Sequence, residues 1–148
     1  MRVRDATISD LDAIVDFIAE EAREAEGRTQ DEEPLRRGVG EALREASLAR
    51  YWLLVDEQDN ACGCTSVITE WSDWNGGFYW WVQSMYIAPE HRGKDYLNTL
   101  VDCVTEAARE AGCLDLRLYV HRDNRAAIRA YEKVGFDHSA YRIMSKPV

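Results

Sequence analysis

The residues most suggestive of chemistry form the loop Glu90-His91-Arg92-Gly93-Lys94-Asp95-Tyr96, which follows a strand-like run and opens a helix. A helix N-terminus offers unpaired backbone N–H groups and a partial positive charge, so it binds phosphate where small residues let the ligand approach. Arg92 and Lys94 add positive charge to this loop. Such a loop is by itself more often a solvated connection than a phosphate site, and on this feature alone both interpretations stay open.

The other reactive side chains do not indicate a metal or redox site. None of the three histidines lies at a metal-ligand spacing from a cysteine or from another histidine. Cys62 and Cys64 alternate along a strand-like run, while Cys103 and Cys113 stand in apolar surroundings, so buried free thiols are expected. We therefore expect no metal and no covalent intermediate on a cysteine.

The elements that position these residues follow from apolar spacing and turn composition. Helices are predicted to begin near Asp10 and at Asp31 to Pro34, and to cover residues 97–111 and 124–134. Strand-like runs cover residues 3–6, 51–56, 61–70, 78–87 and 114–120, with a final strand or hairpin at 136–144. The resulting order is β-α-α-β-β-β-α-β-α-β, an α/β fold with a mixed, mostly antiparallel central sheet flanked by helices.

Composition limits the class of protein. The 148 residues suit a single domain spanning residues 1–148, and 46% of them are hydrophobic, enough for a packed core. The formal charge of −9 disfavours nucleic-acid binding and favours a cationic substrate, although a solvated acidic surface is the commoner explanation. No apolar run approaches the roughly 18 residues of a membrane helix, and no signal-type segment follows Met1, so we expect a cytoplasmic protein with no membrane partner.

Two stretches in the second half of the chain carry a family resemblance. They are Met85-Tyr86-Ile87 leading into Arg92-Gly93-Lys94-Asp95-Tyr96-Leu97, and Asn124-Arg125-Ala126-Ala127-Ile128-Arg129-Ala130-Tyr131-Glu132-Lys133-Val134-Gly135-Phe136. Their order and separation resemble the coenzyme A half of the GNAT superfamily of N-acetyltransferases. The segment Glu70-Trp71-Ser72-Asp73-Trp74 and the run from Trp80 to Ile87 look like a bacterial subgroup of that superfamily, so the resemblance covers essentially the whole chain.

The resemblance implies acetyl-CoA as the cosubstrate and gives roles to individual residues. Main-chain groups of Met85 and Ile87 would pair with the pantetheine arm like an added strand, and the Met85 N–H would polarise the thioester carbonyl. Amides from Arg92 to Leu97 would hold the pyrophosphate, and the Asn124 side chain would bind the pantetheine arm. Tyr131, one to two helical turns beyond Asn124, would lie near the sulfur and protonate the departing thiolate.

The phosphate loop departs from the family pattern, which has small residues where this chain has Asp95 and Leu97. A carboxylate beside a pyrophosphate repels it unless the side chain turns to solvent. Asp is nevertheless among the few residues besides glycine that tolerate positive φ, so Asp95 preserves the shape of the loop. We expect weakened rather than lost coenzyme binding.

The acceptor side carries a second departure. Gln83 stands where relatives with polyamine-type substrates carry a glutamate, and an amide cannot take a proton at neutral pH. Glu70 is the preferred substitute base, or else the anchor for an ammonium group; an exposed strand-end carboxylate is the alternative. Trp71, with three other tryptophans nearby, suits either an amine through cation–π contact or packing in a core or dimer interface.

The sequence therefore predicts transfer of an acetyl group from acetyl-CoA to a primary amine of a small molecule or peptide by direct attack. Tyr131 and Glu70 are the predicted catalytic residues, and Glu70, Trp71 and Gln83 the predicted acceptor-side residues. The alternative is a non-catalytic coenzyme- or ligand-binding module, motivated by the departures just described, and a structural dimerisation protein is a third reading. Dimers are common among relatives, so a homodimer is compatible with the sequence.

Overall fold

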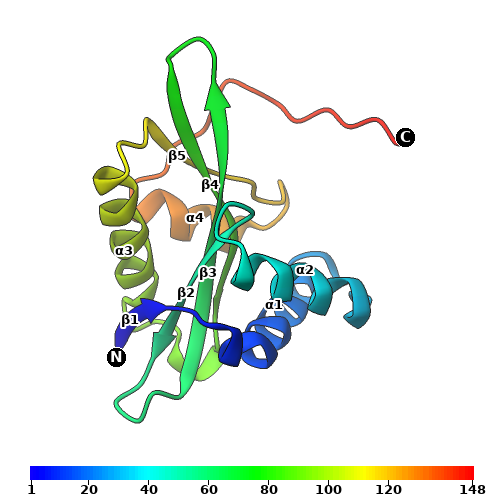
Figure 1. The fold of residues 1–148 in the computed structure, drawn as a ribbon, viewed down its shortest axis with the longest axis vertical. Helices are drawn as coiled ribbons and strands as arrows, with labels where there is room; N and C mark the ends of the chain where they lie inside the picture. The colour runs from blue at the N-terminus through cyan, green and yellow to red at the C-terminus, as the bar shows by residue number, and fades with distance from the viewer.

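The fold is a five-stranded sheet with helices on both faces, seen in a computed structural model that covers residues 1–148 (Figure 1). In chain order the elements are β1 (Arg2–Asp5), the 3-10 turn η1 (Ile8–Asp10), α1 (Leu11–Glu26), α2 (Glu32–Arg44), β2 (Arg50–Val55), β3 (Ala61–Ser72), β4 (Gly77–Ile87), the 3-10 turn η2 (Pro89–His91), α3 (Tyr96–Glu110), β5 (Asp115–Leu118) and α4 (Arg125–Lys133). The predicted order of helices and strands is confirmed through α4.

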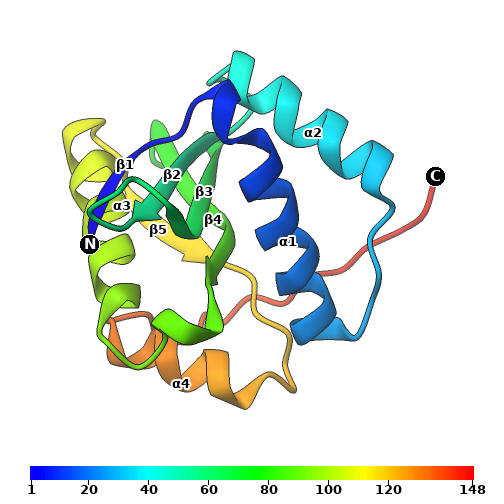
Figure 2. The ribbon, with the colours of Figure 1, turned by 90° about the horizontal axis from the view of Figure 1, so that it is seen from below.

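The strands lie in the order β1-β2-β3-β4-β5. The first four strands pair antiparallel: short turns join β2 to β3 and β3 to β4, whereas α1 and α2 lie between β1 and β2 in the chain. β5 runs parallel to β4 because α3 crosses over between them. Figures 1 and 2 show α1 and α2 on one face of the sheet and α3 and α4 on the other. The mixed, mostly antiparallel sheet flanked by helices is thus confirmed.

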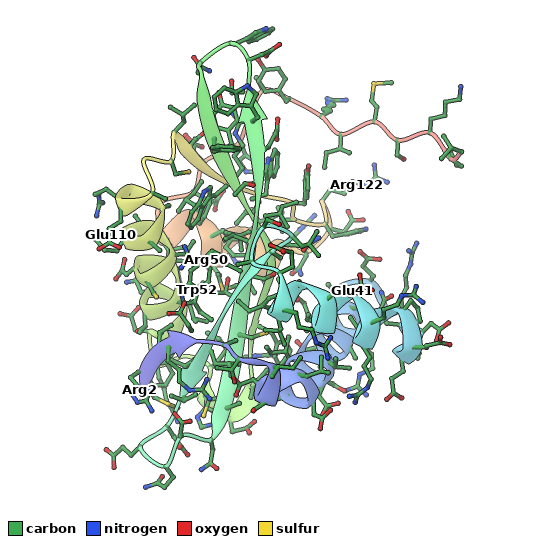
Figure 3. All side chains as sticks on the ribbon, in the orientation of Figure 1. Arg2, Glu41, Arg50, Trp52, Glu110 and Arg122 are labelled. Atoms are coloured by element: carbon green, nitrogen blue, oxygen red, sulfur yellow. The ribbon has the colours of Figure 1, made fainter.

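Two apolar layers hold the helices to the sheet. Because successive strand residues face opposite sides, Leu53 of β2 packs with the α1 and α2 layer, while its neighbours Trp52 and Leu54 face α3. Trp80 joins Trp52 on the α3 side and is only 5% exposed, so it belongs to the core rather than to an acceptor site. The Arg50 guanidinium lies 4.8 Å from the centre of the Trp52 ring (Figure 3).

The helices on the α1 face begin where capping residues stand. The Asp31 carboxylate accepts a hydrogen bond from the Glu33 N–H at 3.3 Å, and α2 starts at the residue after it. Before α1, the Asp10 carboxylate accepts from the Thr7 N–H at 2.7 Å, so a capping box joins Thr7 and Asp10 around the turn that precedes α1, two residues earlier than a box at Ser9 to Asp12. No helix is both long enough and apolar enough to cross a membrane.

Two predicted strands differ from the structure. The final strand expected at residues 136–144 is absent: this segment is irregular and extends away from the body (Figure 1). Tyr141 and Met144 are 79% and 95% exposed, and the segment has no neighbouring strand to satisfy its backbone groups. The strand predicted at 114–120 ends at Leu118, because the chain there turns away from β4.

Candidate active site

The sheet splits at the C-terminal half of β4. The parallel pairing of β5 with β4 extends only from Tyr79 to Val82, although β4 continues to Ile87. The split coincides with a β-bulge, since Val82 pairs with Val67 and Ser84 with Ser66, which leaves Gln83 as the extra residue. The last third of β4 therefore has one edge with no strand beside it.

The free edge presents backbone groups of Met85 and Ile87. The Met85 N–H donates to Oε1 of Glu21 at 3.1 Å, and the Ile87 carbonyl accepts from Nε of Arg92 at 2.7 Å. In a regular sheet such groups would bond to a neighbouring strand, so an extended ligand can take that place. The two residues predicted to pair with the pantetheine arm thus both lie at this edge, and side chains currently occupy their polar groups.

The loop between η2 and α3 forms an open cluster of backbone donors. Gly93 and Asp95 have φ values of 72° and 64°, so Asp95 adopts the positive φ expected from the sequence. The backbone N–H groups of residues 93–98 donate no hydrogen bond within the protein. The exposed Asp95 carboxylate accepts from the Asn98 side chain at 3.4 Å. These donors, at the start of a 15-residue helix, suit an anionic ligand.

The side chain of Arg92 turns away from the loop and towards α1. Its guanidinium lies 2.9 Å from the Glu24 carboxylate and 5.1 Å from the centre of the Tyr86 ring. Glu24 also accepts from the Tyr86 hydroxyl at 3.3 Å. Nζ of Lys94 donates to the Glu90 carbonyl at 3.1 Å, so both cations predicted to support phosphate binding have protein partners.

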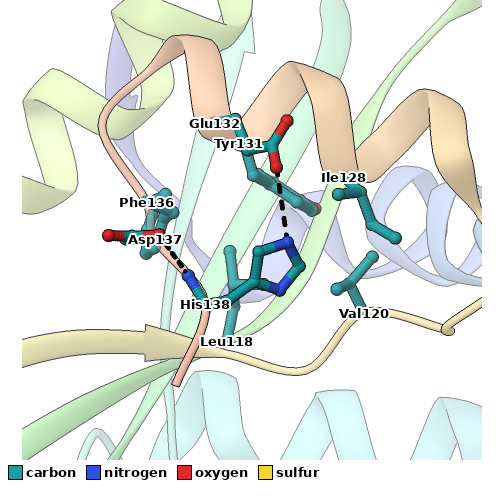
Figure 4. A pocket seen from close by; sticks show the side chains of 8 residues that line it. All are labelled: Leu118, Val120, Ile128, Tyr131, Glu132, Phe136, Asp137 and His138. Atoms are coloured by element: carbon teal, nitrogen blue, oxygen red, sulfur yellow. Dashed lines mark hydrogen bonds and ion pairs between the residues drawn. The ribbon is translucent and has the colours of Figure 1, made fainter. Parts of the chain in front are cut away.

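Tyr131 lies on α4, and Asn124 caps the start of that helix. Tyr131 lines a small cavity of about 50 Å³ and packs edge-on against Phe136, with ring centres 5.8 Å apart (Figure 4). Its hydroxyl has no hydrogen-bond partner in the protein, and burial, with a further contribution from the charge of Glu21, raises its pKa above the ordinary value. Oδ1 of Asn124 accepts from the Ala127 N–H at 3.1 Å and thereby caps α4.

A groove of about 800 Å³ lies between α1, α2 and the sheet, and it reaches the free-edge part of β4 at Gln83 and Ser84. Glu21 and Gln83 line it at the sheet end, and Tyr119 and His121 of the loop after β5 close one side. Twelve of its 20 lining residues are hydrophobic, and its charged side chains are the carboxylates of Glu21 and Glu26, with no Lys or Arg. Such a lining favours a ligand with a cationic head and an apolar body.

Glu21 is a site residue that the sequence reasoning missed. Burial raises its pKa from 4.5 to about 7, the Met85 N–H opposes this rise, and the negative charge of Glu24 adds to it. A signal was present, because Glu21 occupies the apolar face defined by Ile14 and Ile18, at a spacing of three to four residues. A carboxylate on the buried face of a helix has to interact with something there.

Glu70 and Trp71 lie at the other end of the sheet. Glu70 pairs with Tyr79 across the hairpin and accepts a hydrogen bond from Nε1 of Trp81. Tyr79 and Met85 are six residues apart on β4, which corresponds to roughly 20 Å along a strand. Trp71 is 58% exposed and contacts Phe78. The structure therefore places Met85 and Gln83 beside Glu21, whose charge also acts on Tyr131, but leaves Glu70 and Trp71 apart from them.

The comparison with known families agrees with this geometry. The model of the acetyltransferase (GNAT) family matches residues 11–136, from the start of α1 to the end of the α4 region. The chain belongs to the GNAT acetyltransferase family. The part of this GNAT protein that matches the family model runs from α1 through β4, α3 and β5 to α4.

Relatives and solved structures give the same assignment. The chain is 24% identical over 90 residues to the L-amino acid N-acyltransferase MnaT of Escherichia coli, covering 61% of this chain and 52% of that protein. It is 27% identical over 93 residues to an L-methionine sulfoximine/L-methionine sulfone acetyltransferase of Salmonella typhimurium, covering 63% and 54%. The match thus spans about half the length of these two relatives.

Among solved structures, a possible acetyltransferase from Clostridium difficile 630 is similar over nearly the whole chain. The TM-score is 0.92 at 29% identity, covering 99% of this chain and 97% of that one. A ribosomal-protein-alanine N-acetyltransferase from Brucella melitensis biovar Abortus 2308 shares the fold, with a TM-score of 0.72 at 19% identity over 97% and 98% of the two chains.

Proposed function

We propose that this GNAT protein transfers an acetyl group from acetyl-CoA to a primary amine of a small molecule or peptide by direct attack. One observation carries the proposal: β4 continues past its last contact with β5 and leaves a free edge between the open N–H groups before α3, the Tyr131 hydroxyl and an acidic groove. A thioester ligand on that edge would meet an acid on one side and an amine on the other.

The residues at the free edge fit acetyl-CoA, which when bound supplies an acyl group activated as a thioester. Met85 and Ile87 have backbone groups available for strand-like pairing once Glu21 and Arg92 release them. The N–H groups of residues 93–98 would hold the pyrophosphate. The amide nitrogen of Asn124 remains for the pantetheine arm, since Oδ1 caps α4.

Tyr131 is the proposed acid. Its raised pKa keeps the hydroxyl protonated at neutral pH, and the hydroxyl has no competing partner in the protein. A thiolate leaving into this poorly hydrated space would be destabilised without a proton donor. Both properties support Tyr131 as the group that gives up its proton as the carbon–sulfur bond breaks.

The groove lining supports an amine acceptor. Its two carboxylates, with no Lys or Arg among the lining residues, favour a positively charged ammonium group. The names of the two bacterial relatives refer to amino acids or their analogues, which also present an amino group. We therefore assign the groove to the acceptor and the β4 edge to the coenzyme.

The proposal is tested by incubating the purified protein with acetyl-CoA and a panel of amines while following free thiol. We expect turnover with at least one amine and a loss of about 100-fold or more in kcat for Tyr131→Phe. Tyr141→Phe is the matched control, because Tyr141 is 79% exposed and lies outside the site. Acetyl-CoA binding without turnover of any amine would instead favour the non-catalytic binding module.

A further inference from the structure

We infer that Glu21 of α1 is the catalytic base, which takes the proton from the acceptor amine at the mouth of the groove. This inference rests on the proposed acyl transfer and names a residue for the role that Gln83 cannot fill. It places the base on α1 rather than on the strands of the sheet.

The position of Glu21 joins the two proposed binding sites. Its Oε1 lies 3.1 Å from the Met85 nitrogen, the group expected to polarise the thioester carbonyl. The same side chain lines the groove assigned to the amine, together with Gln83 and Ser84. A carboxylate at this junction can reach the attacking nitrogen of the amine by a change of its own side-chain rotamer.

Coenzyme binding would make Glu21 more basic. When a carbonyl oxygen takes over the Met85 N–H, the carboxylate loses the one hydrogen bond that lowers its pKa. Burial and the negative charge of Glu24 both remain, and both favour the protonated form. The carboxylate would thus gain proton affinity when the thioester is in place.

No cation near Glu21 offsets this effect. From α1, the charge of Glu24 acts on Glu21, and Glu24 is itself paired with Arg92. Burial first, and then the charge of Glu21 itself, raises the pKa values of Cys64 on β3 and Tyr131 on α4, so both stay neutral. The other groove-lining groups that titrate are Tyr51 of β2, Glu26 of α1 and, after β5, Tyr119 and His121.

The remaining candidates for a base are less suitable. Glu70 lies at the distant end of the hairpin, where Trp81 occupies its carboxylate. Glu26 lies five residues after Glu21 on α1 and forms an ion pair with Arg28 at 3.3 Å. His121 is exposed, and its Nδ1 accepts from the Asp123 N–H at 3.3 Å.

The proposed step balances as follows. Glu21 takes one proton from the ammonium group, which frees a nitrogen lone pair to attack the carbonyl carbon. The new carbon–nitrogen bond forms, the carbon–sulfur bond breaks, and its electron pair leaves on sulfur. Tyr131 gives its proton to this thiolate and recovers one from the acylated nitrogen. Glu21 then releases its proton to solvent through the groove, so that each turnover yields one proton.

The test compares pH profiles of kcat/KM for the native protein, Glu21→Gln and Glu41→Gln, using the best amine of the panel. Glu41 is an exposed glutamate of α2 outside the groove (Figure 3), so Glu41→Gln is the control. We expect Glu21→Gln to lower kcat/KM about 100-fold to 10,000-fold near neutral pH and to abolish the acidic limb of the profile, which coenzyme binding should shift above pH 7. Its activity should recover as the pH approaches the pKa of the amine, which then needs no base.

The outcomes separate this inference from the function on which it rests. Native turnover with an unchanged rate or an unchanged pH limb in Glu21→Gln would overturn the role of Glu21 while leaving acyl transfer intact. A loss of rate by the same factor at every pH would also overturn it, because a purely structural defect behaves in that way. Absence of native turnover with every amine would overturn both, and calorimetric titration with acetyl-CoA would show whether a binding module remains.

Discussion

Replacing Glu21 by glutamine is expected to stabilise the protein at alkaline pH far more than in acid. The pKa of this partly buried carboxyl rises from 4.5 to about 7 on folding, chiefly through burial, with the Met85 N–H opposing the rise and Glu24 adding to it. One pKa unit corresponds to about 1.36 kcal/mol, so the ionised side chain lowers the free energy of unfolding by roughly 3 kcal/mol. The amide of glutamine carries no charge and still accepts from the Met85 N–H.

The direction with pH follows from the two states. Below pH 4.5 the carboxyl is protonated in both the folded and the unfolded chain, and it costs nothing. Between pH 4.5 and about 7 the unfolded chain releases the proton while the folded protein keeps it, so stability falls as the pH rises. Above about pH 7 both states are ionised and the full cost is present.

Urea unfolding at several pH values measures this effect. Between about pH 5 and about pH 8.5, the stability of Glu21→Gln relative to the native protein should rise by roughly 2 to 3 kcal/mol. The Glu41→Gln control, on an exposed side chain of α2, should show a constant difference. A difference for Glu21→Gln that does not change with pH would refute the argument from burial.

Substitutions at three further positions test other parts of the structure. Gly63→Ala would place a Cβ 2.5 Å from the backbone carbonyl oxygen of Tyr86, so thermal unfolding should show a loss of about 1 to 3 kcal/mol; unchanged stability would mean that β3 and β4 can move apart. Asp95→Asn removes a charge but keeps a side chain that tolerates a φ of 64°. Calorimetry should therefore show acetyl-CoA binding several-fold tighter at low salt. Equal affinity would mean that the carboxylate lies too far from the pyrophosphate to repel it. Asn124→Ala should lower the free energy of unfolding by about 1 kcal/mol through loss of the α4 cap, whereas Asn124→Asp keeps the cap. Weaker acetyl-CoA binding by both variants would therefore assign a separate role to the amide of Asn124.

Most of the fold was predictable because local signals and tertiary packing agree. Asp31 caps α2 as its sequence context indicates, and the alternating apolar residues of β2 serve two cores at once. The segment at 136–144 has strand-like composition but no neighbouring strand, and composition alone cannot supply a backbone partner. The end of β5 at Leu118 could not be predicted from the sequence either, because the apolar alternation continues to Val120.

The site divides in the same way between local and non-local features. The positive φ of Asp95 follows from its residue type, and the pairing role of Met85 came from the family resemblance. The contact between Glu21 and Met85 joins residues 64 positions apart, and only packing of α1 over the split sheet creates it. Glu70 was a reasonable candidate by residue type, but the register of the hairpin places it far from the free edge of β4.

The extra residue at Gln83 determines which residues of β4 face each side of the sheet. Before the bulge, even-numbered residues such as Trp80 and Val82 face α3; after it, Met85 faces α3 and Tyr86 faces α1. Deleting one residue here would shift the alternation of the following residues by one position, which would turn Tyr86 towards α3 and the Met85 N–H back towards β3. The length of this short segment is therefore under a stricter constraint than its composition, whereas the turn at residues 73–76 can absorb insertions.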